Sequence, residues 1–260
     1  MITVPVKLGD RSDDVLVGKG ARHRLLEVLP VGVQRAAIVT QEEIGVRVDA
    51  GIDQHVFTID SGEEAKNLVG AFWQPAAVLC DTEVLESLPP EEYRSGLGEV
   101  AKCQFLPDGD GLADLPLDEK VARCVEIKAR VVGADEREGG LRAILNYGHT
   151  LAHALETAGH YDLRHGEAVA IGLVFAARLA ERLGRIDGAR VDDHVKLVAS
   201  YDLPVDMPPG ADREALLEVM GRDKKALAGL TFVLDGPRGV EVVAGVPRDE
   251  VLGTLVEFVP

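Results

Sequence analysis

The stretch "LNYGHTLAHALETAGHYDLRHGEAVAIG", residues 145–172, holds four of the seven histidines and decides how the second half of the chain is interpreted. His149 and His153 are four residues apart, so in a helix both side chains lie on one face. His165 follows a short loop and begins the next apolar, helix-like run. Imidazoles at adjacent helix ends can converge on one divalent metal ion. On spacing alone, capping or core histidines are the more common explanation of such a pattern.

Charged and amide side chains accompany these histidines in the neighbouring sequence. In "RSGLGEVAK", Glu99 and Lys102 are three residues apart and share one face of a helix. They fit either a functional pair or a solvated ion pair. Arg142 and Asn146 are four apart and lead directly into His149, an arrangement that suits an oxygen-rich anion. A threonine follows His149, so the HExxH motif of metalloproteases is absent.

Lys128 interrupts an otherwise apolar helical face. Val121, Val125, Lys128, Val132 and Asp135 follow i, i+4, i+7 spacing. An ammonium on such a face is costly unless it meets an anion. Alternatively, its stem lies along the surface and its charge reaches water. Taken together, these features indicate metal ligands beside cations suited to a phosphate or carboxylate.

Composition limits the class of protein. The 260 residues include 28 Lys and Arg against 44 Asp and Glu, and the net charge of −16 argues against a nucleic-acid partner. The apolar run at 168–184 contains arginine and glutamate and is too short and too charged to span a membrane. The start of the chain has no signal-peptide pattern, and the three cysteines have no CxxC spacing. We therefore expect a cytoplasmic protein.

The first third of the chain alternates strand-like and helix-like pieces. Strand patterns occupy residues 2–8, 14–20, 35–41, 54–60 and 76–82, with a short helix at 21–30. From "LESLPPEEYRSGLGEVAK" onward the pattern is mainly helical, and "GPRG" forms the turn of a terminal hairpin. We predict an α/β domain at residues 1–82 and a mainly helical metal- and substrate-binding domain at 83–260.

Four long motifs carry a family resemblance. "RSGLGEVAK", "IKARVVGADEREGGLRAILNYGHTLAHALE", "LRHGEAVAIG" and "DKKALAGLTFVL" resemble 3-dehydroquinate synthase. The resemblance implies a Rossmann-like layer joined to a helical domain, NAD and one divalent metal as cofactors, and a homodimer. It also implies the shikimate-pathway cyclisation of 3-deoxy-arabino-heptulosonate 7-phosphate to 3-dehydroquinate, with phosphate release.

The resemblance extends to individual residues. Glu99, His149 and His165 match the three metal-binding positions, with zinc or cobalt as the metal. His153 matches a histidine that contacts the substrate phosphate and transfers a proton, whereas His160 matches no functional position. Glu63 and Lys66 resemble nucleotide-contacting positions. The residues that hold the substrate's phosphate, carboxylate and hydroxyls are matched by Lys102, Lys128, Arg142 and Asn146. Asn67 matches a substrate-contacting asparagine, and Lys224 or Lys225 matches a late lysine that reaches the same pocket.

The sequence departs from this family at one place. The family's glycine-rich "GGG-x-x-GD" segment, which lines the NAD pyrophosphate, and the stretch after it are absent, and the chain instead runs "SGEEAKNLVG". Removing that segment takes central strands out of a parallel sheet, so we expect unpaired strand edges and uncovered apolar faces. Backbone amides that cradle a pyrophosphate have no substitute in isolated side chains.

Three alternatives to the shikimate enzyme remain open. A related cyclase would make a cyclitol from a sugar phosphate without the carboxylate. A catalytically impaired homologue would bind metal but not NAD. A purely structural helical domain is the third, and it gives no reason for so many polar residues in the family's order.

Overall fold

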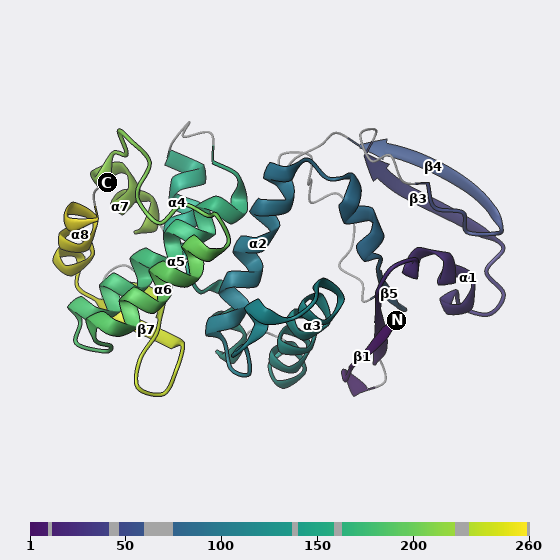
Figure 1. The fold of residues 1–260 in the computed structure, drawn as a ribbon, viewed down its shortest axis with the longest axis horizontal. Coiled ribbons are helices and arrows are strands. Elements are labelled where there is room, and N and C mark those ends of the chain that lie inside the picture. Colours follow the sequence, from purple (N-terminus) through teal and green to yellow (C-terminus); the bar gives the residue numbers. More distant parts are fainter. Residues whose placement is uncertain are drawn as a thin grey trace. The chain divides into compact units, whose positions relative to one another are not determined.

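The computed structural model describes residues 1–9, 12–41, 47–59, 75–136, 140–158, 163–221 and 229–258. The chain divides into two compact units. Met1–Leu88 and Pro116–Gly133 form the first, and Pro89–Leu115 and Ala134–Pro260 form the second. Figure 1 shows both units, coloured along the sequence from purple at the N-terminus to yellow at the C-terminus.

The first unit is built on a mixed three-stranded sheet. Strand β1 (Ile2–Val6) pairs antiparallel with β2 (Asp13–Val17), and β2 pairs parallel with β5 (Val78–Cys80). Strand residues alternate between the two faces of a sheet, which places Val4, Val15 and Val17 in one buried cluster. Helix α3 (Leu117–Ala134) contributes Ala122 to that cluster.

Helix α3 therefore belongs with the N-terminal sheet, although the sequence analysis placed it in the C-terminal domain. Val121 and Val125 also pack against the sheet cluster. The helical pattern reveals an apolar face but not which layer covers it. The predicted single boundary between residues 82 and 83 therefore differs from the observed division, in which residues 116–133 belong to the first unit.

A second, two-stranded sheet completes the strands of this unit. Strands β3 (Arg35–Gln41) and β4 (Asp53–Ile59) run parallel, with Arg35 opposite Asp53. Parallel sheets are ordinarily covered on both faces. In the described part of the chain this pair leaves Val39, Val56 and Phe57 at least half exposed. Such uncovered apolar faces agree with the strands missing from the sequence.

The short helical pieces of this unit are a 3-10 turn η2 (Ala21–Arg24), helix α1 (Leu25–Val28) and the 3-10 helix η4 (Thr82–Ser87). The N-cap of η4 is Asp81, whose carboxylate accepts from the backbone N–H of Glu83. The same carboxylate accepts from the N–H groups of Gly20 and Arg22 and ties η2 to the end of β5. The predicted strands and the short helix at 21–30 are thus all present.

The second unit surrounds one buried helix, α5 (His165–Arg182). Against it pack α2 (Pro90–Phe105), α4 (His149–Ala158), α6 (Gly188–Ser200) and α8 (Arg248–Glu257). The remaining elements are α7 (Arg213–Met220), the antiparallel hairpin β6 (Leu230–Leu234) and β7 (Glu241–Val246), and the 3-10 helices η5 (Leu112–Asp114) and η6 (Leu141–Asn146). Among the described residues, none of the helices is long and apolar enough to cross a membrane.

Local sequence explains where the site-bearing helices begin and end. Helix α2 begins at Pro90, with Glu91 and Glu92 in its first turn, where proline and acidic residues are favoured. Helix α5 ends before Gly184, whose positive φ of 68° lets Arg185 donate its N–H back to the carbonyl of Ala180.

Candidate metal centre

Three side chains from three helices converge in the second unit. Glu99 lies in α2, and His149 and His165 are the first residues of α4 and α5. Their ligand atoms all lie within 4.8 Å of one another. The Nε2 atoms of His149 and His165 are 3.4 Å and 3.9 Å from Oε1 of Glu99. Sequence positions up to 66 residues apart thus form one cluster of an oxygen and two nitrogens.

A glycine beside each of these side chains lets the helices approach closely. A Cβ atom on Gly98 would lie 2.2 Å from the carbonyl oxygen of Gly166, so α2 and α5 touch through their backbones. A Cβ on Gly172 would lie 2.0 Å from the carbonyl oxygen of Gly148, which brings α4 against α5 in the same way. Only glycine fits at such crossings.

The start of α5 is also held from α2. The Oγ atom of Ser95 accepts from the backbone N–H of Gly166 at 3.1 Å, which satisfies one of the free donors at a helix N-terminus. The Glu167 carboxylate accepts from the N–H of Arg164 and ion-pairs with Arg94 at 3.2 Å. His165 is therefore anchored by contacts on both sides.

Both imidazoles are oriented through their second nitrogen. His149 Nδ1 lies 3.1 Å from the carbonyl oxygen of Tyr147, an acceptor, so Nδ1 carries the proton. His165 Nδ1 lies 2.9 Å from Oε1 of Glu156. Such partners fix the tautomer of a metal-binding histidine and leave Nε2 for the metal. In both residues Nε2 is the atom that faces Glu99.

Charges in the cluster balance around Glu99. Lys102 is buried and its Nζ lies 2.9 Å from both carboxylate oxygens of Glu99. The hydrogen bond to Glu99, aided by Glu156 and opposed by burial, raises the pKa of His165 to about 9. Burial, with the nearby His149 and His165, lowers the pKa of His153. The raised pKa of His165 thus reflects the two carboxylates, Glu99 and Glu156, that face its ring.

This donor set fits a divalent transition metal. Zinc and its relatives are bound by imidazole nitrogen and carboxylate oxygen, and a three-residue set leaves coordination positions open for another ligand. Metal binding releases the proton from a protonated imidazole, so a metal at His165 Nε2 would replace the proton that Glu99 now favours.

Other residues assigned in the sequence analysis fall in different places. The rings of His153 and His149 are perpendicular, with centroids 5.5 Å apart. Arg142 and Asn146 lie in η6. The Arg142 guanidinium donates to the carbonyl of Glu136 at 2.8 Å, and Asn146 is exposed. Lys128 lies in α3 of the first unit, partly buried. The residues Glu63, Lys66, Asn67, His160, Lys224 and Lys225 lie outside the described residues.

Sequence reasoning missed Glu156 as a partner of the cluster. Its position relative to His149 and His153 gives the spacing i, i+4, i+7, which puts all three on one face of α4. The signal was therefore present. The backbone carbonyl of Tyr147 offered no such signal, because main-chain acceptors have no sequence signature.

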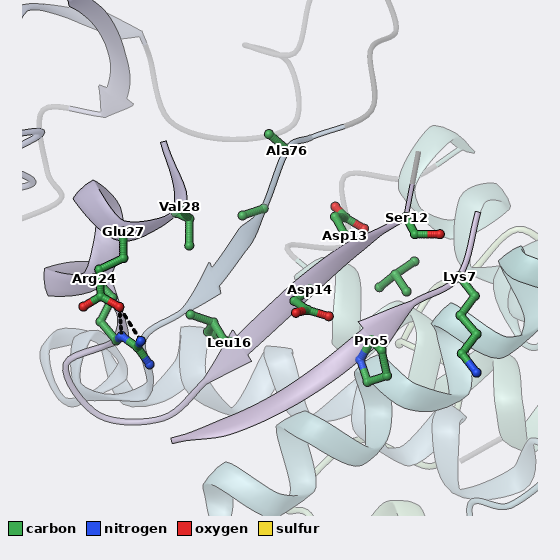
Figure 2. A pocket seen from close by; sticks show the side chains of 12 residues that line it. Pro5, Lys7, Ser12, Asp13, Asp14, Leu16, Arg24, Glu27, Val28 and Ala76 are labelled. Atoms are coloured by element: carbon green, nitrogen blue, oxygen red, sulfur yellow. Dashed lines mark hydrogen bonds and ion pairs between the residues drawn. The ribbon is translucent and has the colours of Figure 1, made fainter. Parts of the chain in front are cut away.

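A separate hollow of about 480 Å³ lies in the first unit, between β1, β2 and α1. Figure 2 shows Asp14 and Leu16 along β2, and Arg24 paired with Glu27. Its charged lining residues are Lys7, Arg24, Asp13, Asp14 and Glu27. With acids outnumbering bases, the hollow is poorly suited to an anionic ligand.

Family models match consecutive parts of the chain. The model described as 3-dehydroquinate synthase N-terminal matches residues 32–95, and the one described as 3-dehydroquinate synthase C-terminal matches residues 96–226.

Two curated relatives differ in how much of their length is shared. A putative aminodehydroquinate synthase of Amycolatopsis mediterranei strain S699 is 38% identical over 329 residues, covering 97% of this chain and 93% of that protein. That aligned length exceeds the 260 residues of this chain by 69, so at least 69 residues of the relative have no counterpart here. The 3-dehydroquinate synthase of Mycobacterium leprae strain TN is 50% identical over 189 residues, 67% of this chain and 52% of that protein.

Solved structures share the fold. A 2-deoxy-scyllo-inosose synthase, crystallised with carbaglucose-6-phosphate, NAD+ and Co2+, superimposes with a TM-score of 0.83 at 18% identity, covering 99% of this chain and 100% of that one. ValA, a 2-epi-5-epi-valiolone synthase from Streptomyces hygroscopicus subsp. jinggangensis 5008 with NAD+ and Zn2+ bound, gives 0.61 at 21% identity, covering 94% of this chain and 72% of that one. The predicted fold class is confirmed.

Proposed function

Because this chain belongs to the 3-dehydroquinate synthase family, we propose that it is a metal-dependent sugar-phosphate cyclase that converts 3-deoxy-arabino-heptulosonate 7-phosphate to 3-dehydroquinate. The observation that carries the proposal is the convergence of Glu99, His149 and His165, with ligand atoms within 4.8 Å. The M. leprae relative, 50% identical over two thirds of this chain, supports the choice of substrate.

We assign different roles to the residues of the cluster. Glu99, His149 and His165 would hold the metal, which would polarise a substrate hydroxyl, and NAD would accept the hydride lost when that hydroxyl becomes a carbonyl. Glu156 and the Tyr147 carbonyl keep the two imidazoles in the required tautomer. Lys102, already at Glu99, supplies a buried positive charge beside the place where substrate oxygens would bind. His153, next to His149, is the group we assign to proton transfer.

We assign no described residue of this chain to NAD binding. The residues assigned to it in the sequence analysis, Glu63 and Lys66, lie outside the described part of the chain. The glycine-rich segment that lines the pyrophosphate in the family is absent from the sequence. Proteins of this fold were crystallised with NAD+. The dependence of phosphate release on NAD is therefore measured directly in the test below.

A second candidate substrate is the aminated analogue of the first. The A. mediterranei relative that aligns with nearly all of this chain is named a putative aminodehydroquinate synthase. The two candidate reactions would share the metal cluster and the release of phosphate. They differ in one substituent of the substrate, so one assay discriminates between them.

The test is phosphate release by the purified chain supplied with Co2+ or Zn2+. Each candidate substrate is offered with and without NAD, and the His149→Ala variant is the control. Release that disappears in the variant supports the cyclase, and the faster substrate names the reaction. A folded, metal-loaded chain that releases phosphate from neither substrate contradicts the proposal and leaves a metal-binding homologue.

A further inference from the structure

A buried polar chain continues inward from the metal cluster. Tyr147, whose carbonyl holds His149, is fully buried, and its hydroxyl lies 2.8 Å from Nε2 of His194 in α6. His194 Nδ1 lies 2.8 Å from the carbonyl oxygen of Arg190, and His194 is itself fully buried. Two backbone carbonyls and two side chains thus form one connected path.

The direction of each hydrogen bond follows from the acceptors. A carbonyl oxygen only accepts, so His194 Nδ1 donates to Arg190, and the Nε2 atom of the neutral ring is left as an acceptor. The Tyr147 hydroxyl therefore donates to Nε2. Burial lowers the pKa of His194 to about 4, which agrees with a neutral ring.

A stacking contact also orients the ring of His194. The Phe105 ring lies parallel to it, with an interplanar angle of 4° and a centroid distance of 3.8 Å. Phe105 is the last residue of α2, the helix that carries Glu99. His194 accordingly contacts both the segment that positions His149 and the helix that carries Glu99.

We propose that His194, acting through the hydroxyl of Tyr147, is a positioning residue that holds His149 in register with Glu99. Between Tyr147 and His149 lies only Gly148, which is pressed against the backbone of α5, so a shift of Tyr147 passes directly to His149. Buried polar groups must be paired, which gives the Tyr147 hydroxyl one position rather than several. The proposal rests on the metal site proposed above.

Metal affinity tests this role without recourse to catalysis. The readouts are the dissociation constant for Co2+ and the visible absorption spectrum of the Co2+-loaded chain. We expect His194→Leu and Tyr147→Phe to weaken Co2+ binding by about 10- to 100-fold, the range for groups that orient a metal ligand, and to shift the spectrum. His194→Gln places an amide oxygen near the former Nε2 and is expected to restore both readouts.

A matched control separates positioning from general stability. Val251→Ala removes volume from the buried side of α8, whose Glu250 and Glu257 pair with Arg182 at the opposite end of α5 from His165, and should lower stability without changing the Co2+ spectrum. Unchanged affinity and spectrum in both His194→Leu and Tyr147→Phe would overturn the proposal, as would an equal loss in Val251→Ala. A wild-type chain that binds no Co2+ would overturn the metal site itself, and the inference with it.

Discussion

Glu156 is the residue whose replacement most directly tests the hydrogen bonds around the metal ligands. Its carboxylate lies 2.9 Å from His165 Nδ1, so Glu156→Gln removes the charge while keeping the size of the side chain. The amide orients the imidazole less strongly, and we expect Co2+ affinity to fall by about tenfold or more. Isothermal titration of the purified variant with Co2+ measures the loss.

Glu181→Gln is the matched control for that substitution. Glu181 is an exposed residue of the same helix as His165, sixteen positions further on. The Glu181→Gln variant should bind Co2+ with the same affinity as the unaltered chain. An equal loss in both variants would trace the effect to overall charge, and the assigned role of Glu156 would be wrong.

At the residue scale, spacing indicated that the histidines could share a metal, and the family resemblance added Glu99 to the set, but neither indicated how the side chains are held. The positions of Glu99, His149 and His165 followed from the motifs, and the structure brings them together. The hydrogen bonds of Tyr147 and His194 depend on how α6 packs, which no pattern in the sequence fixes. Buried pairs of this kind are decided by tertiary contacts over long sequence separations.

At the scale of elements, the crossing of α2 and α5 is the feature that sets the spacing of the ligands. In Gly98→Ala the new Cβ would lie 2.2 Å from the Gly166 carbonyl, so the two helices must separate. Glu99 then moves away from His165, and we expect Co2+ affinity to drop by more than tenfold along with a loss of stability. Co2+ titration and urea unfolding measure the two effects.

The same helix offers the opposite substitution as a control. Gly96 lies two residues earlier, and a Cβ there meets no atom within 4 Å. Because alanine is the better helix former, Gly96→Ala should raise the free energy of unfolding by up to about 1 kcal/mol and leave Co2+ binding intact. Identical behaviour of the two variants would show that helix contact does not position the ligands.

Elements were more predictable than their partners. Local patterns placed the strands of the first unit, a helix after His149, a second helix beginning at His165, and the terminal hairpin. Helix α6 was not singled out, although Asp187 provides a cap by accepting from the N–H of Arg190. The assignment of α3 to the sheet depended on which apolar face meets which, information that periodicity does not contain.

At the scale of the whole molecule, the shortened sequence affects the two units unequally. The second unit retains a continuous core around α5 and the complete cluster of three ligands. The first unit carries a two-stranded parallel sheet with exposed apolar side chains, and the A. mediterranei relative has at least 69 residues with no counterpart here. The proposed metal site thus lies in the unit with the continuous core, and the residues assigned to NAD in the sequence analysis, Glu63 and Lys66, lie outside the described residues.

The acid stability of the molecule depends on His194. Its folded-state pKa of about 4 lies below the ordinary value of 6.5, because burial outweighs the attraction of Asp235 and Asp193 and the bond to Arg190. Between pH 6.5 and about 4, His194 is protonated in the unfolded chain but remains neutral in the folded chain. Stability from this group is therefore complete above pH 6.5 and falls as the pH drops, by roughly 3 kcal/mol in total.

Urea unfolding of the wild type and His194→Gln at pH 7 and pH 4.5 measures this contribution. The wild type should lose roughly 2 kcal/mol more than the variant, since glutamine has no proton to bind. His165 does not obscure the comparison: its raised pKa of about 9 makes its contribution complete below pH 6.5, and it is common to both chains. Equal losses would mean that the folded chain admits a proton at His194, and that the buried ring is more open to water than its full burial implies.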